Sequence, residues 1–140
     1  MKYELLKFTE RGDDNGRLVA VEGEKEIPFD IKRIFYIYGT KSKVVRGQHA
    51  NLNSSFVLIN VSGSCKVKLF DGTEEKTVAL DKPNIGLHIP KMIWKDMYDF
   101  SPNSVLLVLS DCHYDSGEYI RDINEYIAMV VKRGNDKSSL

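Results

Sequence analysis

The feature that most restricts the fold of this chain is a succession of short β-type runs, each of which ends at a turn signal. Branched and aromatic residues dominate these runs, and such residues favour extended strands. The Asp71-Gly72 dipeptide separates two of the runs and is typical of a hairpin. Turns spaced by about 8–12 residues predict an all-β sandwich or barrel. The runs expected to form strands are Arg17–Glu22, Lys32–Tyr38, Phe56–Val61, Cys65–Phe70, Lys76–Leu80, Ile85–Ile89, Trp94–Phe100 and Val105–Leu109.

The C-terminal part of the chain follows a different period. After Ser116 apolar residues recur at helical spacing, and the sequence Lys132-Arg133-Gly134 is typical of a helix end. We therefore expect one C-terminal α-helix that ends at Gly134 and packs against the β-structure. Residues 1–134 are expected to form a single domain, and residues 135–140 a polar tail. The apolar residues at helical spacing are Ile120, Ile123, Ile127 and Val130.

Charge and composition exclude several classes of function. The chain has 140 residues, and its 20 basic and 20 acidic side chains cancel, so bulk electrostatic attraction to nucleic acid is not expected. No apolar run approaches the ~20 residues that span a bilayer, and the N-terminus lacks the apolar core of a signal peptide. Cys65 and Cys112 are too few for a disulfide scaffold. We expect a cytoplasmic protein that binds neither nucleic acid nor membrane.

Two blocks in the middle of the chain are Arg46–Ser55 and Ile89–Lys95. They are similar to the paired motifs of the cupins, a family of small jelly-roll barrels. In the cupin pattern these motifs supply histidines and a glutamate to one metal ion inside the barrel. The matching positions here hold His49, Asn51, Ser55 and Lys95. Only the imidazole is a good metal ligand, and the lysine ammonium repels a divalent cation. We therefore expect a cupin barrel with a C-terminal helix, with no metal and no other cofactor.

A polar row near the first block predicts a binding site. Gly47, His49, Asn51, Asn53 and Ser55 have the same parity, so on one strand their side chains face the same way. Polar side chains inside a barrel are costly unless water or a ligand satisfies them. An inward row therefore indicates a polar cavity, and the alternative is a surface edge strand with the row facing outward.

Basic and aromatic residues flank the same blocks. The basic side chains are candidates to hold a diphosphate, which arginine binds through paired, charge-assisted hydrogen bonds. The aromatic rings can stack on a base or orient a sugar. The alternatives are solvated surface charges and core aromatics. The candidate basic residues are Arg17, Arg33, Arg46 and Lys95, and the candidate aromatic residues are Tyr36, Tyr38, Trp94 and Tyr98.

Several fragments spread along the chain combine into a more specific pattern. They are Ile27-Pro28-Phe29, Ile31 to Ile37, Arg46-Gly47, His49-Ala50, Gly63-Ser64-Cys65, Gly86-Leu87, Trp94, Tyr114-Asp115 and Tyr119-Ile120-Arg121. From about Gly16 to Tyr126, this pattern resembles the TDP-4-oxo-6-deoxy-D-glucose 3,4-oxoisomerases of the WxcM-like cupins. Each fragment is short, and the combination carries the resemblance.

The resemblance implies a metal-free cupin homodimer whose subunits exchange an N-terminal strand. It implies an isomerase that converts a TDP-4-keto-6-deoxyhexose into the 3-keto sugar through an enediol. Such products feed the synthesis of 3-amino-3,6-dideoxyhexoses for surface glycans such as lipopolysaccharide or S-layer glycan. The proton transfer needs a base with a pKa near neutrality, which histidine supplies. His49 is therefore the expected base, with Asn51 and Tyr38 orienting or polarising the sugar.

The chain departs from the family pattern close to the expected base. The family usually carries His-Ala-His where this chain has His49-Ala50-Asn51, and Lys95 stands where a histidine is common. Lys95 or Tyr38 is an alternative carrier of part of the proton relay. The rival hypotheses are a module that binds TDP-sugars without turnover and a metal-dependent cupin enzyme. The sequence leaves open the configuration of the product at C4.

Overall fold

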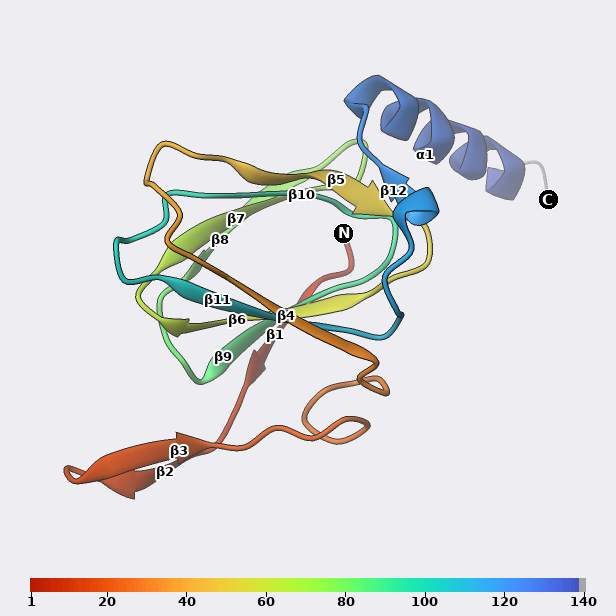
Figure 1. Ribbon diagram of the computed structural model, residues 1–140. Coiled ribbons are helices and arrows are strands. Elements are labelled where there is room, and N and C mark those ends of the chain that lie inside the picture. The colour runs from red at the N-terminus through yellow and green to blue at the C-terminus, as the bar shows by residue number, and fades with distance from the viewer. Residues whose placement is uncertain (139–140) are drawn as a thin grey trace.

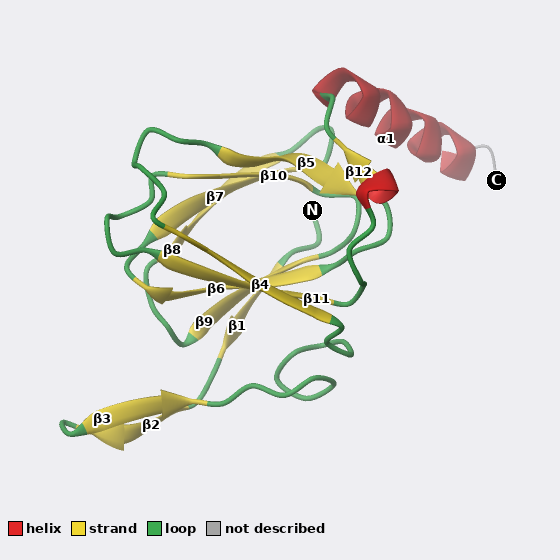
Figure 2. Cartoon of the chain, in the orientation of Figure 1, coloured by secondary structure: helices red, strands yellow, loops and turns green. Residues whose placement is uncertain are grey.

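The computed structural model describes residues 1–138 and contains two five-stranded antiparallel sheets that face each other (Figure 1, Figure 2). The first sheet consists, in spatial order, of β1 (Glu4–Lys7), β9 (Ile85–Ile89), β6 (Phe56–Ser62), β11 (Val105–Ser110) and β4 (Arg33–Tyr38). The second consists of β12 (Tyr119–Ile120), β5 (Arg46–Asn51), β10 (Trp94–Tyr98), β7 (Cys65–Phe70) and β8 (Glu75–Leu80).

Successive strands mostly cross from one sheet to the other. The chain passes from β4 in the first sheet to β5 in the second, returns to β6, and alternates in the same way from β8 to β11. Only the β7–β8 hairpin, closed by Asp71-Gly72, joins consecutive strands of one sheet along this path. This is jelly-roll connectivity. The prediction of an all-β cupin-type barrel with one C-terminal helix is confirmed.

Aliphatic side chains fill one part of the space between the sheets. Alternate strand residues point inward, as the two-residue period of a strand requires. Burying each such side chain stabilises the fold by about 1.5–3 kcal/mol. We call this part the filled interior, and its fully buried members are Val67, Leu69, Leu80, Leu87, Ile89 and Leu106.

A separate hairpin projects from the barrel near the N-terminus. Strands β2 (Glu10–Asp13) and β3 (Gly16–Val19) form a two-stranded sheet of their own, and Figure 1 shows them extending away from the barrel. All residues of β2 are exposed, and Leu18 on β3 is 57% exposed. The sequence predicted one strand here, Arg17–Glu22, because the polar residues of β2 carry no alternation that would reveal a strand.

The segment before the C-terminal helix differs from the prediction. Ile120 was expected on the helix, but Ser116–Glu118 forms a 3₁₀ turn and Tyr119–Ile120 forms β12, which pairs with the end of β5. The helix begins later because Asp122 caps it. The Asp122 carboxylate accepts hydrogen bonds from the N–H groups of Asn124 and Glu125 at 2.8 and 3.0 Å.

The end of the helix also differs from the prediction. α1 spans Ile123–Ser138 and continues through Gly134, where the sequence predicted its C-terminus. An exposed glycine inside a helix costs only about 1 kcal/mol relative to alanine, so it does not by itself end the helix. The polar tail predicted from residue 135 therefore begins within α1, and residues 139 and 140 of that tail lie outside the described residues. Within residues 1–138, no helix is both long and apolar enough to cross a membrane.

Candidate active site

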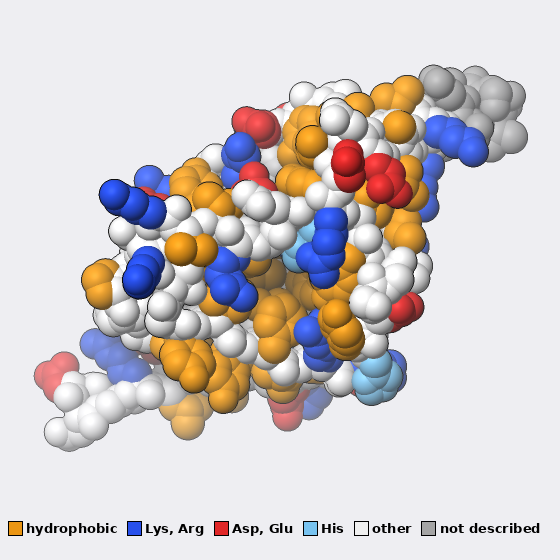
Figure 3. All heavy atoms as spheres, turned by 45° about the horizontal axis from the view of Figure 1, so that its top comes forward, with side chains coloured by type: hydrophobic (Ala, Val, Ile, Leu, Met, Phe, Trp, Pro, Cys, Tyr) orange, Lys and Arg blue, Asp and Glu red, His pale blue; other side chains and the backbone are white. Residues whose placement is uncertain are grey.

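A cavity opens between the two sheets beside the filled interior. It has a volume of about 380 Å³, which lies within the usual range for small-molecule sites. In the space-filling view of Figure 3, a hollow is visible among Lys and Arg side chains, with a histidine at its margin. The apolar part of its wall includes Phe35, Phe56, Leu58, Met97 and Val108. The cavity therefore combines an apolar wall with a charged rim.

Strand β4 contributes one side of this cavity through strict alternation. Arg33, Phe35 and Ile37 are half-buried and line the cavity. Tyr36 and Tyr38 alternate with these residues along the strand and are 62% and 69% exposed, so they face outward. Their rings stack on each other with centroids 6.0 Å apart. The sequence suggested both tyrosines as candidate site residues, but the two-residue period of the strand turns them outward, and neither lines the cavity of its own chain.

Strand β5 carries His49 into the cavity by means of a bulge. Gly47 and Gln48 both have positive φ, 84° and 54°, and the pairing with β10 shifts by one residue at this point. A Cβ on Gly47 would lie 2.9 Å from the Lys95 carbonyl oxygen, so glycine is required there. Beyond the bulge, His49 pairs directly with Lys95 on β10. The two side chains therefore project from neighbouring strands into the same cavity.

The environment of His49 keeps its imidazole neutral. Its Nδ1 lies 3.0 Å from the Gly47 carbonyl oxygen, which can only accept, so Nδ1 carries the proton and Nε2 is a free base. The Tyr119 ring packs against the imidazole with centroids 4.8 Å apart. Burial, reinforced by the positive charge of Lys95, lowers the pKa of His49 to about 4. The site therefore presents an unprotonated imidazole at neutral pH.

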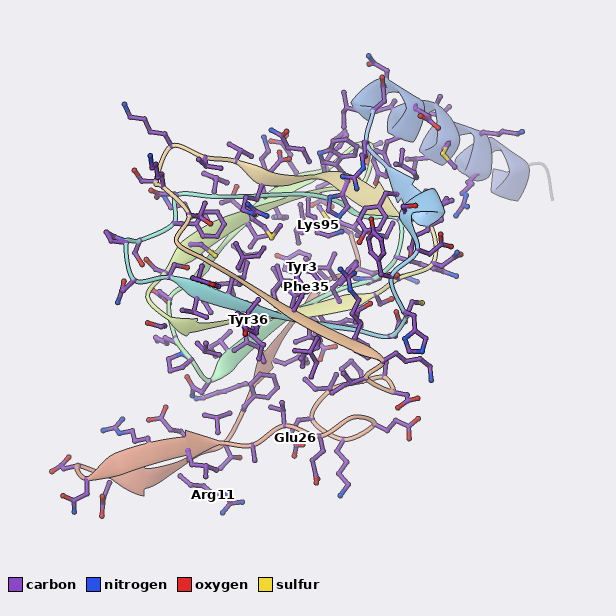
Figure 4. All side chains as sticks on the ribbon, in the orientation of Figure 1. Tyr3, Arg11, Glu26, Phe35, Tyr36 and Lys95 are labelled. Carbon is purple, nitrogen blue, oxygen red and sulfur yellow. The ribbon has the colours of Figure 1, made fainter. Side chains whose placement is uncertain are left out.

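Lys95 is a buried amine in the wall of the cavity. It is 4% exposed, and Figure 4 shows it with Phe35 in the space between the sheets. Its Nζ lies 4.7 Å from the centroid of the Phe56 ring and donates a hydrogen bond of 3.2 Å to Asn51 Oδ1. Burial lowers the pKa of Lys95 to about 7, although the charge of Glu118 opposes this effect.

Glu118 is a buried carboxylate that ties the segment after β11 to the end of β5. Its oxygens accept hydrogen bonds from the N–H groups of Asn53 and Ser54 at 3.1 and 2.9 Å, and from the Ser54 hydroxyl. Hydrogen bonds from Ser54 and Asn53 lower the pKa of Glu118 against the opposing effect of its burial. These hydrogen bonds hold Glu118 in place, and they thereby position Tyr119 and Arg121, which follow it in the chain, at the cavity.

The cavity presents four basic side chains: Arg33, Arg46, Lys95 and Arg121. Arg33 donates a hydrogen bond of 3.3 Å to the Tyr119 hydroxyl, and the Arg121 guanidinium lies 4.7 Å from the centroid of the Tyr119 ring. Such a group of guanidiniums suits a ligand with several negative charges, above all a diphosphate. The cavity does not suit a metal ion. The side chains that usually bind metals are His, Cys, Asp and Glu, and His49 is the one residue of these types among the lining residues.

Four of the sequence-predicted site residues lie in the cavity, and the others do not. Those in the cavity are His49, Arg33, Arg46 and Lys95. Asn51 is 1% exposed and lies behind the wall, where it contacts Lys95.

The remaining candidates are placed away from the cavity by local geometry. Arg17 lies on the projecting hairpin and pairs with Glu10 at 2.7 Å. Trp94 and Tyr98 have the opposite parity to Lys95 on β10, and the indole packs on Tyr126 of α1 with centroids 5.6 Å apart. The chain leaves β5 at Asn51, so Ser55 does not continue the inward row that the sequence predicted.

Sequence reasoning missed three residues of the site: Glu118, Tyr119 and Arg121. They were assigned to the start of the helix because Ile120 fits the helical spacing. The signal that separates them is Asp122, which is followed three residues later by Glu125, a typical helix start. A helix that begins after Asp122 leaves the preceding residues free to form a strand.

This chain is similar to several known proteins. The family model of the WxcM-like, C-terminal FdtA family matches residues 1–131. The TDP-4-oxo-6-deoxy-alpha-D-glucose-3,4-oxoisomerase of Aneurinibacillus thermoaerophilus is 38% identical over 137 residues, covering 98% of this chain and 99% of that protein. A 3,4-ketoisomerase from Helicobacter canadensis has a TM-score of 0.90 and 48% identity over 93% of this chain and 98% of its own. A mutant 3,4-ketoisomerase from Thermoanaerobacterium thermosaccharolyticum, in complex with TDP-4-keto-6-deoxyglucose, has a TM-score of 0.91 and 40% identity over 94% and 95%.

Proposed function

Because this chain belongs to the WxcM-like FdtA family, we propose that it is a sugar-nucleotide 3,4-ketoisomerase. Its substrate is a TDP-4-keto-6-deoxyhexose and its product is the corresponding 3-keto sugar. The observation that carries the proposal is a neutral imidazole that lines a cationic cavity between two sheets. This arrangement combines a base for a carbon acid with a site for a diphosphate.

The charged rim holds the nucleotide part of the substrate. Arg33, Arg46 and Arg121 come from three separate segments and face one cavity, so they can contact the diphosphate from several sides. This leaves the sugar next to His49 and the apolar wall. The deoxy methyl group at C6 suits that wall, since it carries no hydroxyl that would need a partner.

His49 carries the proton between the two reacting carbons. The proton on C3 is acidic because the neighbouring C4 is a ketone, and Nε2 of the neutral imidazole removes it. The electron pair forms the C3–C4 double bond as the C4 oxygen takes up a proton, which gives an enediol. The C3 hydroxyl then loses its proton as the C3 carbonyl forms, and the imidazolium returns its proton to C4. One base suffices for both transfers because adjacent carbons of the enediol lie within its reach. No step requires a metal.

The assembly is proposed to be a homodimer whose subunits exchange an N-terminal strand, and we place this strand in the β2–β3 hairpin. Two exposed features support this: the hairpin β2–β3 projects from its own barrel, and the edge strand β4 presents an apolar outer face. Ile34, Tyr36 and Tyr38 on that face are 60–69% exposed, and apolar faces of this kind are typical of subunit interfaces. Exchange would also bring Arg17 to the partner subunit, where this side chain would reach a substrate bound in the partner's cavity.

An aminotransferase converts a keto group into an amine, so the 3-keto product is a suitable substrate for such an enzyme. The reaction therefore fits the synthesis of 3-amino-3,6-dideoxyhexoses for surface glycans. A cytoplasmic location is proposed because Cys65 and Cys112 are both free thiols.

Incubation with TDP-4-keto-6-deoxyglucose in heavy water, followed by NMR, tests the proposed reaction. We expect the 3-keto product to form with deuterium at the exchanged carbon, since the imidazolium exchanges its proton with solvent. The same spectrum reports the configuration at C4. Binding of TDP without product or deuterium incorporation would contradict the proposal and identify a non-catalytic sugar-nucleotide module.

A further inference from the structure

We propose that Lys95 is a second catalytic residue, a general acid that carries a proton between the two oxygens of the substrate while His49 carries one between its carbons. This inference rests on the proposed ketoisomerase function. Removal of the C3 proton places negative charge on the oxygen at C4, and a single imidazole that has just taken up the carbon proton does not neutralise that charge. A donor at the oxygens is therefore needed.

The position of Lys95 suits this role. It is the direct cross-strand partner of His49, and such partners have Cβ atoms about 4.5–5.5 Å apart on one face of a sheet. Both side chains line the same cavity. A sugar placed with C3 and C4 over the imidazole therefore has its C3 and C4 oxygens within reach of a neighbouring amine.

The amine also has protons to offer. Among residues 1–138, its one hydrogen bond is the 3.2 Å contact to Asn51 Oδ1, and a lysine ammonium has three N–H donors. Asn51 thus acts as a positioning residue that holds the amine from behind and leaves the other donors to the cavity. The charged and titratable groups around Lys95 are His49 and Arg46 on β5, Arg33 on β4, and Glu118, Tyr119 and Arg121 on the segment after β11.

His49 and Lys95 have pKa values that suit one as the base and the other as the acid. The pKa of His49 is lowered to about 4 and that of Lys95 to about 7. Between these values the imidazole is an unprotonated base and the amine a protonated acid. Neighbouring titratable groups whose environments separate their pKa values in this way are typical of acid–base pairs in enzymes.

The other cationic groups of the cavity are poorer candidates for the acid. Guanidiniums do not release a proton near neutral pH, which excludes Arg33, Arg46 and Arg121. The Tyr119 hydroxyl accepts a hydrogen bond from Arg33 at 3.3 Å, and the Tyr119 ring packs against the imidazole of His49. Tyr119 is therefore the matched alternative that an experiment must separate from Lys95.

The proposed cycle returns both residues to their starting states. The C3–H bond breaks and its proton passes to His49 Nε2, while the electron pair forms the C3–C4 double bond. The C4 oxygen takes a proton from Lys95, which yields a neutral enediol and a neutral amine. The C3 hydroxyl then gives its proton to that amine as the C3 carbonyl forms, and the imidazolium gives its proton to C4.

The pH dependence of kcat/KM tests this assignment. In the wild-type protein we expect kcat/KM to rise with pH through about 4, as His49 loses its proton, and to fall as pH rises through about 7, as Lys95 loses its proton. Lys95→Arg keeps the charge but cannot release a proton, so we expect a loss of about 100-fold or more in kcat and no alkaline fall. Lys95→Met should lose a similar factor, with TDP affinity measured by calorimetry to verify the binding site.

Two further variants keep the inference testable if the buried substitutions disturb folding. Glu118→Gln removes a charge that raises the pKa of Lys95, so the alkaline limb should move to lower pH. Tyr119→Phe should leave that limb in place. Three results would each overturn the role of Lys95. The first is a wild-type profile with no alkaline limb, and the second is a limb that moves in Tyr119→Phe but not in Glu118→Gln. The third is a kcat of Lys95→Arg close to that of the wild-type protein. Failure of the wild-type protein to convert the substrate would instead overturn the proposed function.

Discussion

The filled interior and the cavity lie side by side between the same two sheets, yet they are built from different residues. The filled interior contains aliphatic side chains such as Leu69 and Leu87, which are fully buried. The cavity has an apolar wall as well, but Arg33, His49 and Lys95 replace aliphatic side chains at inward positions. The same strand geometry therefore supports both a core and a reaction site.

The difference shows how the barrel tolerates buried charge. β10 contributes Lys95 to the cavity, and the β7 residue paired with it is Leu69 of the filled interior. A buried ammonium without partners would be strongly destabilising, but here an amide oxygen, an aromatic face and a nearby carboxylate offset its desolvation. The buried aliphatic side chains pack beside these groups, and the cavity carries charged side chains that the filled interior lacks.

The largest expected effect is on catalysis, at the imidazole. We expect His49→Asn to reduce kcat by about 10²–10⁴-fold, because it removes the base, while TDP affinity remains close to wild type. His88→Asn is the matched control, since His88 lies on β9 against Phe29 and does not line the cavity. Turnover by His49→Asn at the rate of this control would show that the cavity histidine is not the base.

A pair of leucine truncations compares the two regions in stability. Leu69→Ala in the filled interior creates a new void, and we expect it to lower the free energy of unfolding by about 3–5 kcal/mol. Leu58→Ala enlarges a cavity that already exists, so about 2–3 kcal/mol is expected. Urea denaturation of both variants measures the difference. Equal losses would mean that the cavity wall is as tightly packed as the filled interior.

A smaller effect is expected at the charged rim. Arg121→Ala removes charge-assisted hydrogen bonds to a diphosphate, so TDP affinity should fall by about 10–100-fold, with a weaker dependence on salt. Arg133→Ala on the exposed side of α1 is the control and should bind TDP as the wild-type protein does. Calorimetric titration at two salt concentrations measures both. If the two variants bound TDP equally well, the diphosphate would have to lie away from Arg121.

Particular residues show how far the sequence predicts this site. His49 and Lys95 were identified because motif spacing places them at inward positions, and Arg33 and Arg46 because they flank those motifs. Tyr36 and Tyr38 were misplaced because their position near the motif blocks does not reveal which of the two alternating faces of the strand is inward. Arg121 was missed because Ile120 fits the helical spacing, which assigned this segment to the helix. The Asp122 cap marks the true start of the helix, but the pairing of the segment with a strand about 70 residues earlier follows only from the tertiary structure.

The sequence by itself determined the kind of fold, since strand-like runs, turn signals and a C-terminal helical period depend on local preferences of the chain. It also determined that a histidine without partner ligands stands at the cupin motif. Only the tertiary structure decided that Lys95 lies opposite that histidine, and that Glu118 holds a distant segment against the cavity. Burial and neighbouring charge set the proton affinities of these groups, and both arise only when separate strands come together.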